Sequence, residues 1–502
     1  GMQMDKNNSN RKCKDLKNHL YGYRKWLVDI VTRYSDEINT FIHPWHAWIL
    51  SLFTNGCSIE NAIGIIAEKF NISVHESNEI LKPWIENKQQ LEIRIRDINI
   101  LIPRNVIIFQ DKIDRTETLE SINIPLPSFK WVDLATQRHA TPHSLTFMLT
   151  NRCLTNCCYC YADKRRNIGK PLSVERILEI IHQAKDIGVY NISLIGGEVF
   201  LYPKWDIILK ELIDNGFCPD VISTKMPLTE ELIDKIIKTG YNGKIQFSLD
   251  TINYSIAKHM LGVDKDYLKK FLHGILLFEK HSSIQYRIET VLTKDNACEK
   301  NISELFSFLN ERENISAWEI RAVMFSCYNS ERNFLSIRPS KDNLIRLYQY
   351  IDDNIAKKAS FKIITSRSEF NKRYFYAEKG SSSFEGSKCS ALNHHLFVLP
   401  DGKCTICEQL YWNQNFVIGD LNADDILSVW NSPKALELLN IEQHNINPQS
   451  ACHNCSFYED CFKIYRNRCW VDIIKSYGEN NWDFPDPRCK FAPKVMRDVN
   501  YL

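Results

Sequence analysis

The chain has 502 residues, with 63 Lys and Arg against 61 Asp and Glu, which gives a formal net charge of +2. This balance excludes a protein that binds nucleic acid or an anionic membrane along its whole length. Hydrophobic residues make up 44% and charged residues 25%, as in ordinary globular proteins. At roughly 100–200 residues per domain, the length predicts about three domains.

Neither a membrane span nor an export signal is predicted. The sequence has no apolar run of the length, about 18 residues, that a transmembrane helix requires. Its first 15 residues are polar and lack the apolar centre of a secretory signal. We therefore expect a cytoplasmic protein with no membrane partner.

The first part of the chain is predicted to form a small domain over residues 18–115. Residues 18–42 alternate between apolar and polar, which indicates one or two strands. Three helices are expected next: 43–56, 58–72 with Ser58 as its cap, and 73–91, broken near Pro83. Strands that flank three short helices are typical of a winged helix-turn-helix. The proline-containing stretch 116–143 is expected to be a linker.

Residues 144–340 alternate between apolar strands and amphipathic helices. The six apolar runs begin at residues 144, 191, 220, 244, 286 and 317. Repeated strand–helix units of this spacing predict parallel strands joined by right-handed crossovers. Six such units fit a partial (β/α)6 TIM-like barrel, with chemistry at the carboxyl ends of the strands. A helical bridge is expected over 341–385, and residues 386–495 have too little periodicity to predict a core, so we expect metal to hold them together.

The 17 cysteines are the unusual feature of the composition. A reducing cytoplasm disfavours disulfides, so clustered cysteines there indicate metal binding or catalysis. Four lie between residues 153 and 160, and eight lie between 389 and 489. The five scattered ones are interpreted as small buried side chains: Cys13, Cys57, Cys218, Cys298 and Cys327.

Three of the clustered cysteines, Cys153, Cys157 and Cys160, form a C-x3-C-x2-C motif directly after the first predicted barrel strand. Three thiolates on one loop can ligate three irons of a [4Fe–4S] cube and leave the fourth iron open. A zinc site would need a fourth protein ligand. Cys158 lies inside the spacing and is not expected to be a ligand.

This motif, with the aromatic Tyr159 before its last cysteine, resembles that of the radical S-adenosylmethionine (radical SAM) enzymes. The resemblance implies that the open iron binds the methionyl amine and carboxylate of S-adenosyl-L-methionine. It further implies that reductive cleavage of this cofactor yields a 5′-deoxyadenosyl radical.

The ends of the following strands carry further residues that resemble the family's cofactor site. Gly196, Gly197 and Glu198 correspond to the GGE motif, whose carboxylate accepts hydrogen bonds from the methionine amine. Ser248 and Asp250 match the position that contacts the ribose, with Ser248 preferred. Weaker matches are Thr224, where the family often has Thr-Asn-Gly, and Leu292, expected either against adenine or in the core.

The second group of cysteines resembles the SPASM extension, which holds two auxiliary [4Fe–4S] clusters. The resemblance assigns Cys389, Cys407 and Cys469 to the first cluster, with Cys404 as a further candidate. It assigns Cys452, Cys455, Cys461 and Cys489 to the second. The cysteine that the family has next after Cys461 is absent here; Tyr465 occupies that place, and Cys469 is expected to substitute. A zinc ribbon built from Cys404, Cys407, Cys452 and Cys455 is the alternative.

Glu408 follows Cys407 directly. In the sulfatase-maturing relatives, an acidic residue at this position acts as a base on the substrate. A solvent-facing glutamate is the alternative interpretation, and the sequence does not decide between the two.

The front domain resembles the RiPP recognition element, a winged-helix module that binds leader peptides of ribosomally made precursors. Such modules take up the leader as an added strand. A winged helix can also bind DNA, but residues 18–92 lack a dense Lys/Arg face for phosphate contacts.

Together these features predict a radical SAM peptide maturase with three [4Fe–4S] clusters, and with flavodoxin or ferredoxin as an external reductant. The expected architecture is α/β, a partial (β/α)6 barrel between an N-terminal winged helix and a C-terminal SPASM domain. The leading product is a thioether or carbon–carbon crosslink in a precursor peptide. The alternatives are sulfatase-maturase-like oxidation of a Ser or Cys, and a zinc-dependent DNA-binding regulator.

Overall fold

The computed structural model describes most of the chain. The described residues are 11–12, 28–31, 39–42, 44–53, 58–85, 87–95, 98–102, 106–109, 138–139, 141–164, 168–367, 389–464, 466, 468–497 and 499. Two compact units divide them: residues 1–143 with 184–190, and residues 144–183 with 191–502. None of the described helices has both the length and the hydropathy that a bilayer span requires.

The first unit contains paired strands around three helices. Strands β2 (Val28–Val31) and β3 (Asn39–Ile42) pair antiparallel, as do β4 (Leu91–Ile95) and β5 (Ile98–Ile102). A short antiparallel pair joins β1 (Arg11–Lys12) to β6 (Ile108–Phe109). Between the two hairpins lie α1 (Pro44–Ser51), α2 (Ile59–Phe70), α3 (Val74–Leu81) and the 3-10 turn η1 (Lys82–Trp84). The winged-helix interpretation of this order stays a prediction.

The helices of the first unit begin where their caps predict. Ser58 accepts a hydrogen bond from the Asn61 backbone, and Ser73 forms a reciprocal capping box with Glu76. The predicted break near Pro83 is confirmed, because α3 ends at Leu81 and a 3-10 turn follows. Buried apolar side chains from the helices and from Ile102, Val106 and Ile107 share one core, which includes Leu50, Phe53, Ala62, Ile66 and Leu81.

The second unit contains the predicted parallel strands, divided between two sheets. Strands β7 (Ser144–Met148) and β8 (Asn191–Ile195) lie in one sheet; β9 (Val221–Thr224), β10 (Lys244–Ser248), β11 (Tyr286–Leu292) and β12 (Ile315–Ala322) lie in the other. All six predicted strands are therefore confirmed, and every pairing among them is parallel.

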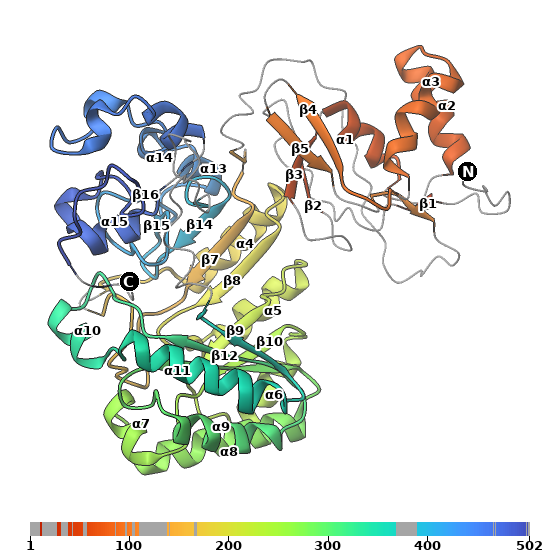
Figure 1. Cartoon of the computed structure of the whole chain (residues 1–502). Helices are drawn as coiled ribbons and strands as arrows, with labels where there is room; N and C mark the ends of the chain where they lie inside the picture. The colour runs from red at the N-terminus through yellow and green to blue at the C-terminus, as the bar shows by residue number, and fades with distance from the viewer. Residues whose placement is uncertain are drawn as a thin grey trace. The chain divides into compact units, whose positions relative to one another are not determined.

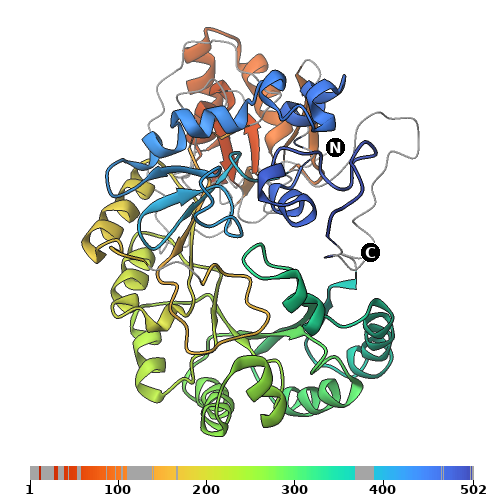
Figure 2. The same cartoon turned by 90° about the vertical axis from the view of Figure 1, so that its left-hand side faces the viewer.

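Helices alternate with these strands. They are α4 (Val174–Asp186), α5 (Trp205–Asp214), α6 (Glu230–Lys238), α7 (Tyr254–Leu261), α8 (Lys265–His281), α9 (Glu299–Asn310), α10 (Glu331–Ile337) and α11 (Lys341–Ile351), with the 3-10 turn η2 at Val199–Leu201. Figures 1 and 2 show helices α6 to α9 along the outer side of the strands. In Figure 2 the loop that follows β7 lies on the opposite side of the strands from these helices, inside the curve that the strands form. This is the arrangement of a partial, open barrel.

The predicted helical bridge over 341–385 contains a strand. After α11 and the π-helical turn η3 (Asp352–Ala356), strand β13 (Lys362–Thr365) pairs parallel with β12. The sequence pattern missed this strand because it is only four residues long and partly exposed. Residues 368–388 lie outside the described residues.

The C-terminal segment continues the sheet of β7. Strand β14 (His395–Val398) pairs parallel with β7 and antiparallel with β15 (Lys403–Thr405), which pairs with β16 (Val417–Asp420). Short helices and turns complete it: α13 (Ile426–Trp430), α14 (Pro433–Leu439), α15 (Trp470–Tyr477), and η4 to η7 at 443–445, 451–454, 459–464 and 479–481. Because β14 adds directly to β7, the cysteine-rich segment is joined to the first barrel strand by backbone hydrogen bonds.

Candidate active site and auxiliary metal centres

A cavity of about 380 Å³ lies at the carboxyl ends of the barrel strands. Its lining includes Cys153, Cys157 and Cys160 but not Cys158, which packs against helix α7 in a small apolar cluster with Ala257 and Met260. The Thr155 hydroxyl lies 3.5 Å from Cys153 Sγ and 3.2 Å from Cys157 Sγ. The three thiols therefore face one space from one loop, as ligation of a cube with an open iron requires.

The GGE residues dock this cysteine loop onto the end of β8. Gly197 N donates to Thr150 O (2.7 Å), and Glu198 N donates to Arg152 O (2.8 Å). A Cβ atom on Gly197 would lie 2.2 Å from Arg152 O. Glycine is therefore required at this position because the backbone of the loop occupies the space of a side chain.

The Glu198 carboxylate is almost fully buried and held from three sides. Its Oε1 accepts from Thr224 Oγ1 (2.9 Å) and Phe200 N (3.2 Å), and its Oε2 accepts from Lys225 N (2.8 Å). Burial raises the pKa of Glu198, although these donors oppose the shift. Glu198 and Thr224 both line the cavity, and the hydrogen bond from Thr224 helps to fix the orientation of the Glu198 carboxylate.

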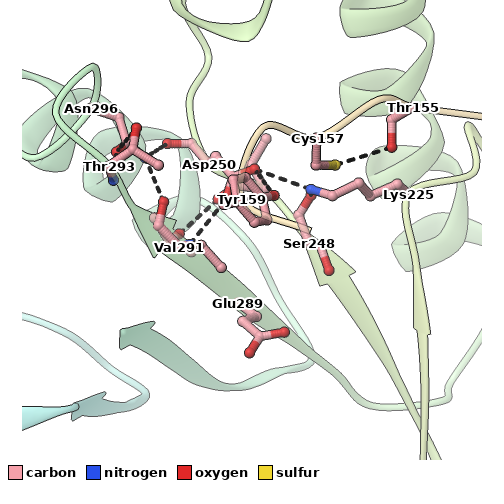
Figure 3. A network of polar contacts seen from close by, with 12 residues as sticks. Thr155, Cys157, Tyr159, Lys225, Ser248, Asp250, Glu289, Val291, Thr293 and Asn296 are labelled. Carbon is pink, nitrogen blue, oxygen red and sulfur yellow. Dashed lines mark hydrogen bonds and ion pairs between the residues drawn. The ribbon is translucent and has the colours of Figure 1, made fainter. Parts of the chain in front are cut away.

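Asp250 is the centre of a buried network beneath the cavity (Figure 3). Tyr159 donates its hydroxyl to Asp250 Oδ2 (2.5 Å), and Lys225 Nζ lies 3.1 Å from the same oxygen. Val291 N donates to Asp250 Oδ1 (2.9 Å). The Asp250 side chain has no exposed surface, so it holds strands β10 and β11 and the cysteine loop together; it does not line the cavity. Ser248, the preferred residue of that strand, does line it.

Leu292 is also absent from the cavity wall. It is fully buried, because side chains of β11 alternate and the neighbouring Val291 and Glu289 face the cavity. The structure therefore supports the core interpretation of Leu292 and gives Val291 the wall position.

Several charged residues of the cavity were not found from the sequence. Lys225 is the clearest: it stands where the family often has asparagine, and it forms the ion pair with Asp250. Burial alone would lower the pKa of Lys225. The negative charge of Asp250 and of other acidic neighbours has the larger effect, so the pKa of Lys225 is raised. Glu289 and Arg321 form a second pair (3.1 Å) on the wall. The sequence did contain a signal for these residues: charged residues stand at every second position of β11 and β12. Alternate residues of a strand share a face, so this pattern predicts a charged face on the two strands.

Glu408 lies on the wall of the same cavity, with Tyr161, Tyr411 and Arg321. Burial raises the pKa of Glu408, and the Arg321 charge opposes that shift. The solvent-facing alternative is therefore not what the structure shows. The cysteine-rich segment contributes Glu408 to the cavity that contains the three thiols.

The auxiliary cysteines fall into two groups in space. Burial raises the pKa of Cys407 and of Cys469, and Cys389 is near enough to raise both further. In the second group, burial raises the pKa of Cys461 and Cys489, and Cys452 and Cys455 add to both shifts. Gln443 Nε2 donates to the backbone carbonyls of Cys452 (2.9 Å) and Cys455 (2.8 Å), which fixes that turn.

Cys404 is not placed with either group. It is fully buried in β15, and burial with Asp420 and Asp401, not with a cysteine, raises its pKa. Cys404 as a cluster ligand, and the zinc ribbon that needs it beside Cys407, stay predictions. Tyr465 lies outside the described residues.

The two cysteine groups are spread more widely than the ligands of one ion. Across the described ranges, no three His, Cys, Asp or Glu side chains converge on a single-ion site. Each group consists of soft thiol donors, the donor set of iron–sulfur clusters, which contain several metal ions. The residues therefore fit the expected clusters in kind and grouping.

Two family models match the chain. Residues 147–288 match the radical SAM superfamily, and residues 389–456 match the SPASM iron–sulfur cluster-binding domain. The chain thus has an α/β fold that contains a radical SAM domain and a C-terminal SPASM domain. These domains imply iron–sulfur clusters and S-adenosylmethionine as cofactors.

The relatives include proteins of different kinds. The probable GTP 3′,8-cyclase of Methanothermobacter thermautotrophicus is 25% identical over 287 residues, 56% of this chain and 88% of that protein. The subtilosin biosynthesis protein AlbA of Bacillus subtilis is 22% identical over 331 residues, 64% of this chain and 67% of that protein. Another cyclase, from Sulfurisphaera tokodaii, matches over 50% of its own length.

A solved structure is similar over nearly the whole chain. The S-adenosylmethionine complex of Streptococcus suis SuiB has a TM-score of 0.59 at 19% identity, and covers 95% of this chain and 99% of that one. SuiB bound to its precursor peptide SuiA gives a TM-score of 0.57 at 18% identity. At this identity the similarity establishes the fold, in which this chain is close to SuiB.

Proposed function

We propose that this protein is a peptide maturase that installs a crosslink in a ribosomally made precursor. One observation carries the proposal: the thiols of the radical SAM loop and Glu408 of the SPASM domain line one cavity. A site formed by both domains suits a substrate that is modified between them. Two relatives support a peptide substrate, because SuiB binds the precursor peptide SuiA and AlbA is a biosynthesis protein of the bacteriocin subtilosin.

When bound, the radical SAM cluster and S-adenosylmethionine supply a 5′-deoxyadenosyl radical. The chain's own residues would position the reactants: Glu198 would accept a hydrogen bond from a donor group of the cofactor, and Ser248 would contact its ribose. Glu408 would remove a proton from the substrate, since it lines the cavity and burial raises its pKa, a shift that the Arg321 charge opposes. Two further clusters are held by Cys389, Cys407 and Cys469, and by Cys452, Cys455, Cys461 and Cys489. Flavodoxin or ferredoxin supplies electrons, and the N-terminal domain binds the leader.

The proposal is tested with anaerobically reconstituted protein and with peptides from any short open reading frames beside its gene as candidate precursors. We expect a precursor whose mass falls by about two hydrogens per crosslink, with 5′-deoxyadenosine formed. Replacement of Cys153, Cys157 and Cys160 by Ala should abolish 5′-deoxyadenosine but keep the iron of two clusters. Retained 5′-deoxyadenosine in that variant would refute the site.

Glu408→Gln separates cofactor cleavage from peptide chemistry. Loss of a general base typically costs 10²–10⁴-fold, so we expect crosslinking to fall by about that factor. Uncoupled 5′-deoxyadenosine formation should stay within about threefold, as it should in the exposed control Glu175→Gln. GTP serves as a competing substrate, because turnover of GTP and not of peptide would favour the cyclase relatives' activity.

A further inference from the structure

A small pocket of about 20 Å³ is lined by Cys389 and lies apart from the cavity described above. Cys389, Arg466, Arg468 and Trp470 line it, together with apolar side chains that include Phe462. It is thus an apolar pocket with two guanidinium groups and an indole N–H in its wall.

The polar side chains of this pocket are deeply buried. Arg466 is 8% exposed, Arg468 6% and Trp470 7%. Five of their nitrogens have no hydrogen-bond partner within the described part of the chain: Arg466 Nε and Nη2, Arg468 Nε and Nη1, and Trp470 Nε1. A buried N–H group without an acceptor is costly, and a buried cation without a counter-charge more so. Such a cluster of unpaired donors indicates an anionic acceptor.

The two arginines face different cysteine groups. Arg466 donates to Ala391 O (3.4 Å) and lines the pocket together with Cys389. Arg468 Nη2 lies 3.8 Å from Cys452 Sγ, and its guanidinium lies over the Phe462 ring, 4.1 Å from the centroid. No carboxylate in the described ranges forms an ion pair with either guanidinium. The cysteine sulfurs of the two auxiliary groups are therefore the partners that the two guanidinium groups share: Cys452 Sγ with Arg468, and Cys389 with Arg466.

We infer that Arg466 and Arg468 are the buried counter-charges of the two auxiliary clusters, one arginine for each, and that each donates hydrogen bonds to cluster sulfur. A four-iron cube held by three or four thiolates has a net negative charge that increases on reduction. Net charge and hydrogen bonds to sulfur set the potential of such clusters. The arginines thus make both clusters easier to reduce. This inference rests on the presence of auxiliary clusters and not on the identity of the peptide.

The test is an EPR-monitored redox titration of the reconstituted holoprotein with four variants, Arg466→Gln, Arg466→Lys, Arg468→Gln and Arg468→Lys. Each Gln variant should shift the potential of one auxiliary cluster to a more negative value, or lose about four of about twelve irons, while the other cluster is unchanged. Each Lys variant should recover iron content and most of the potential. Arg312→Gln is the matched control, because Arg312 is a part-buried arginine that pairs with Glu279 in the barrel.

Two results would overturn the inference. One is unchanged potentials and full iron in both Gln variants. The other is a Lys variant that is as impaired as its Gln counterpart, because that would show packing and not charge. If the wild-type protein itself holds only the iron of one cluster, the assignment of auxiliary clusters is wrong, and the inference fails with it. That result would not depend on which peptide is the substrate.

Discussion

At the scale of residues, one glycine, Gly197, allows the cysteine loop to pack against the end of β8. Gly197 has no space for a side chain, since its Cβ would lie 2.2 Å from Arg152 O. We predict that Gly197→Ala displaces the loop and lowers stability by about 1–3 kcal/mol. The loop carries the three thiols, so iron content should fall by about one cluster.

Gly169→Ala is the control for this variant, because a Cβ there would meet nothing within 4 Å. It should keep full iron and the melting temperature of the parent protein. Full iron in Gly197→Ala would mean that the loop docks without the glycine.

Two cysteines of the C-terminal segment allow a second residue-scale test. Cys469 is near Cys389, whereas Cys404 is fully buried in β15 without a cysteine among the groups that shift its pKa. We predict that Cys469→Ala loses about four irons per chain and most peptide crosslinking. Cys404→Ala should keep its iron and lose only stability.

Iron analysis and crosslinking of the two variants, side by side, decide between these cysteines. Full iron and normal turnover in Cys469→Ala would leave Cys469 free. Loss of iron in Cys404→Ala would restore that residue as the ligand.

At the scale of elements, the His395 side chain joins β14 to β7 by hydrogen bonds. Its Nδ1 and Nε2 lie 2.8 Å from Ser144 Oγ and Thr146 Oγ1, one ring nitrogen donating and the other accepting. Burial, with His394, lowers the pKa of His395 from 6.5 to about 4. The folded state thus resists protonation, so this contribution to stability is complete above pH 6.5 and is lost as the pH falls toward 4.

We predict that the free energy of unfolding decreases by about 2 kcal/mol from this group alone between pH 7.5 and pH 5. His395→Gln cannot be protonated and should lose that part of the pH dependence, measured by urea unfolding. Thr146→Ser keeps the hydroxyl and should keep the dependence. An unchanged pH dependence in His395→Gln would place the titrating group elsewhere.

Elements with strong periodicity were predictable, and short or partly exposed ones were not. The six apolar runs became β7 to β12 because each buries a continuous face, whereas the four residues of β13 do not. The residues of the functional site also fall into those that the sequence predicts and those that it does not. Spacing revealed the thiols and the GGE residues, but Lys225, Arg466 and Arg468 acquire their roles only from tertiary neighbours. Leu292 and Asp250 show the same limit, since strand register alone decides which neighbour lines the cavity.

At the scale of the whole molecule, the two proposed functions, radical chemistry and leader binding, belong to different units. The second unit contains the cavity, the three thiols and Glu408, and it has its own parallel sheets and helices. The first unit has a separate core with none of these groups. Radical formation and leader binding should therefore be separable functions.

We predict that deletion of residues 1–115 leaves uncoupled 5′-deoxyadenosine formation within about threefold, because the residues that hold the cofactors remain. Crosslinking of full-length precursor should fall at least 100-fold at low peptide concentration, since affinity through the added strand is lost. High concentrations of peptide should restore part of the rate, which a damaged active site would not permit. Iron content and the melting temperature of the shortened protein provide the control. Equal crosslinking rates for the shortened and the full chain at low peptide would show that the first unit does not bind the leader.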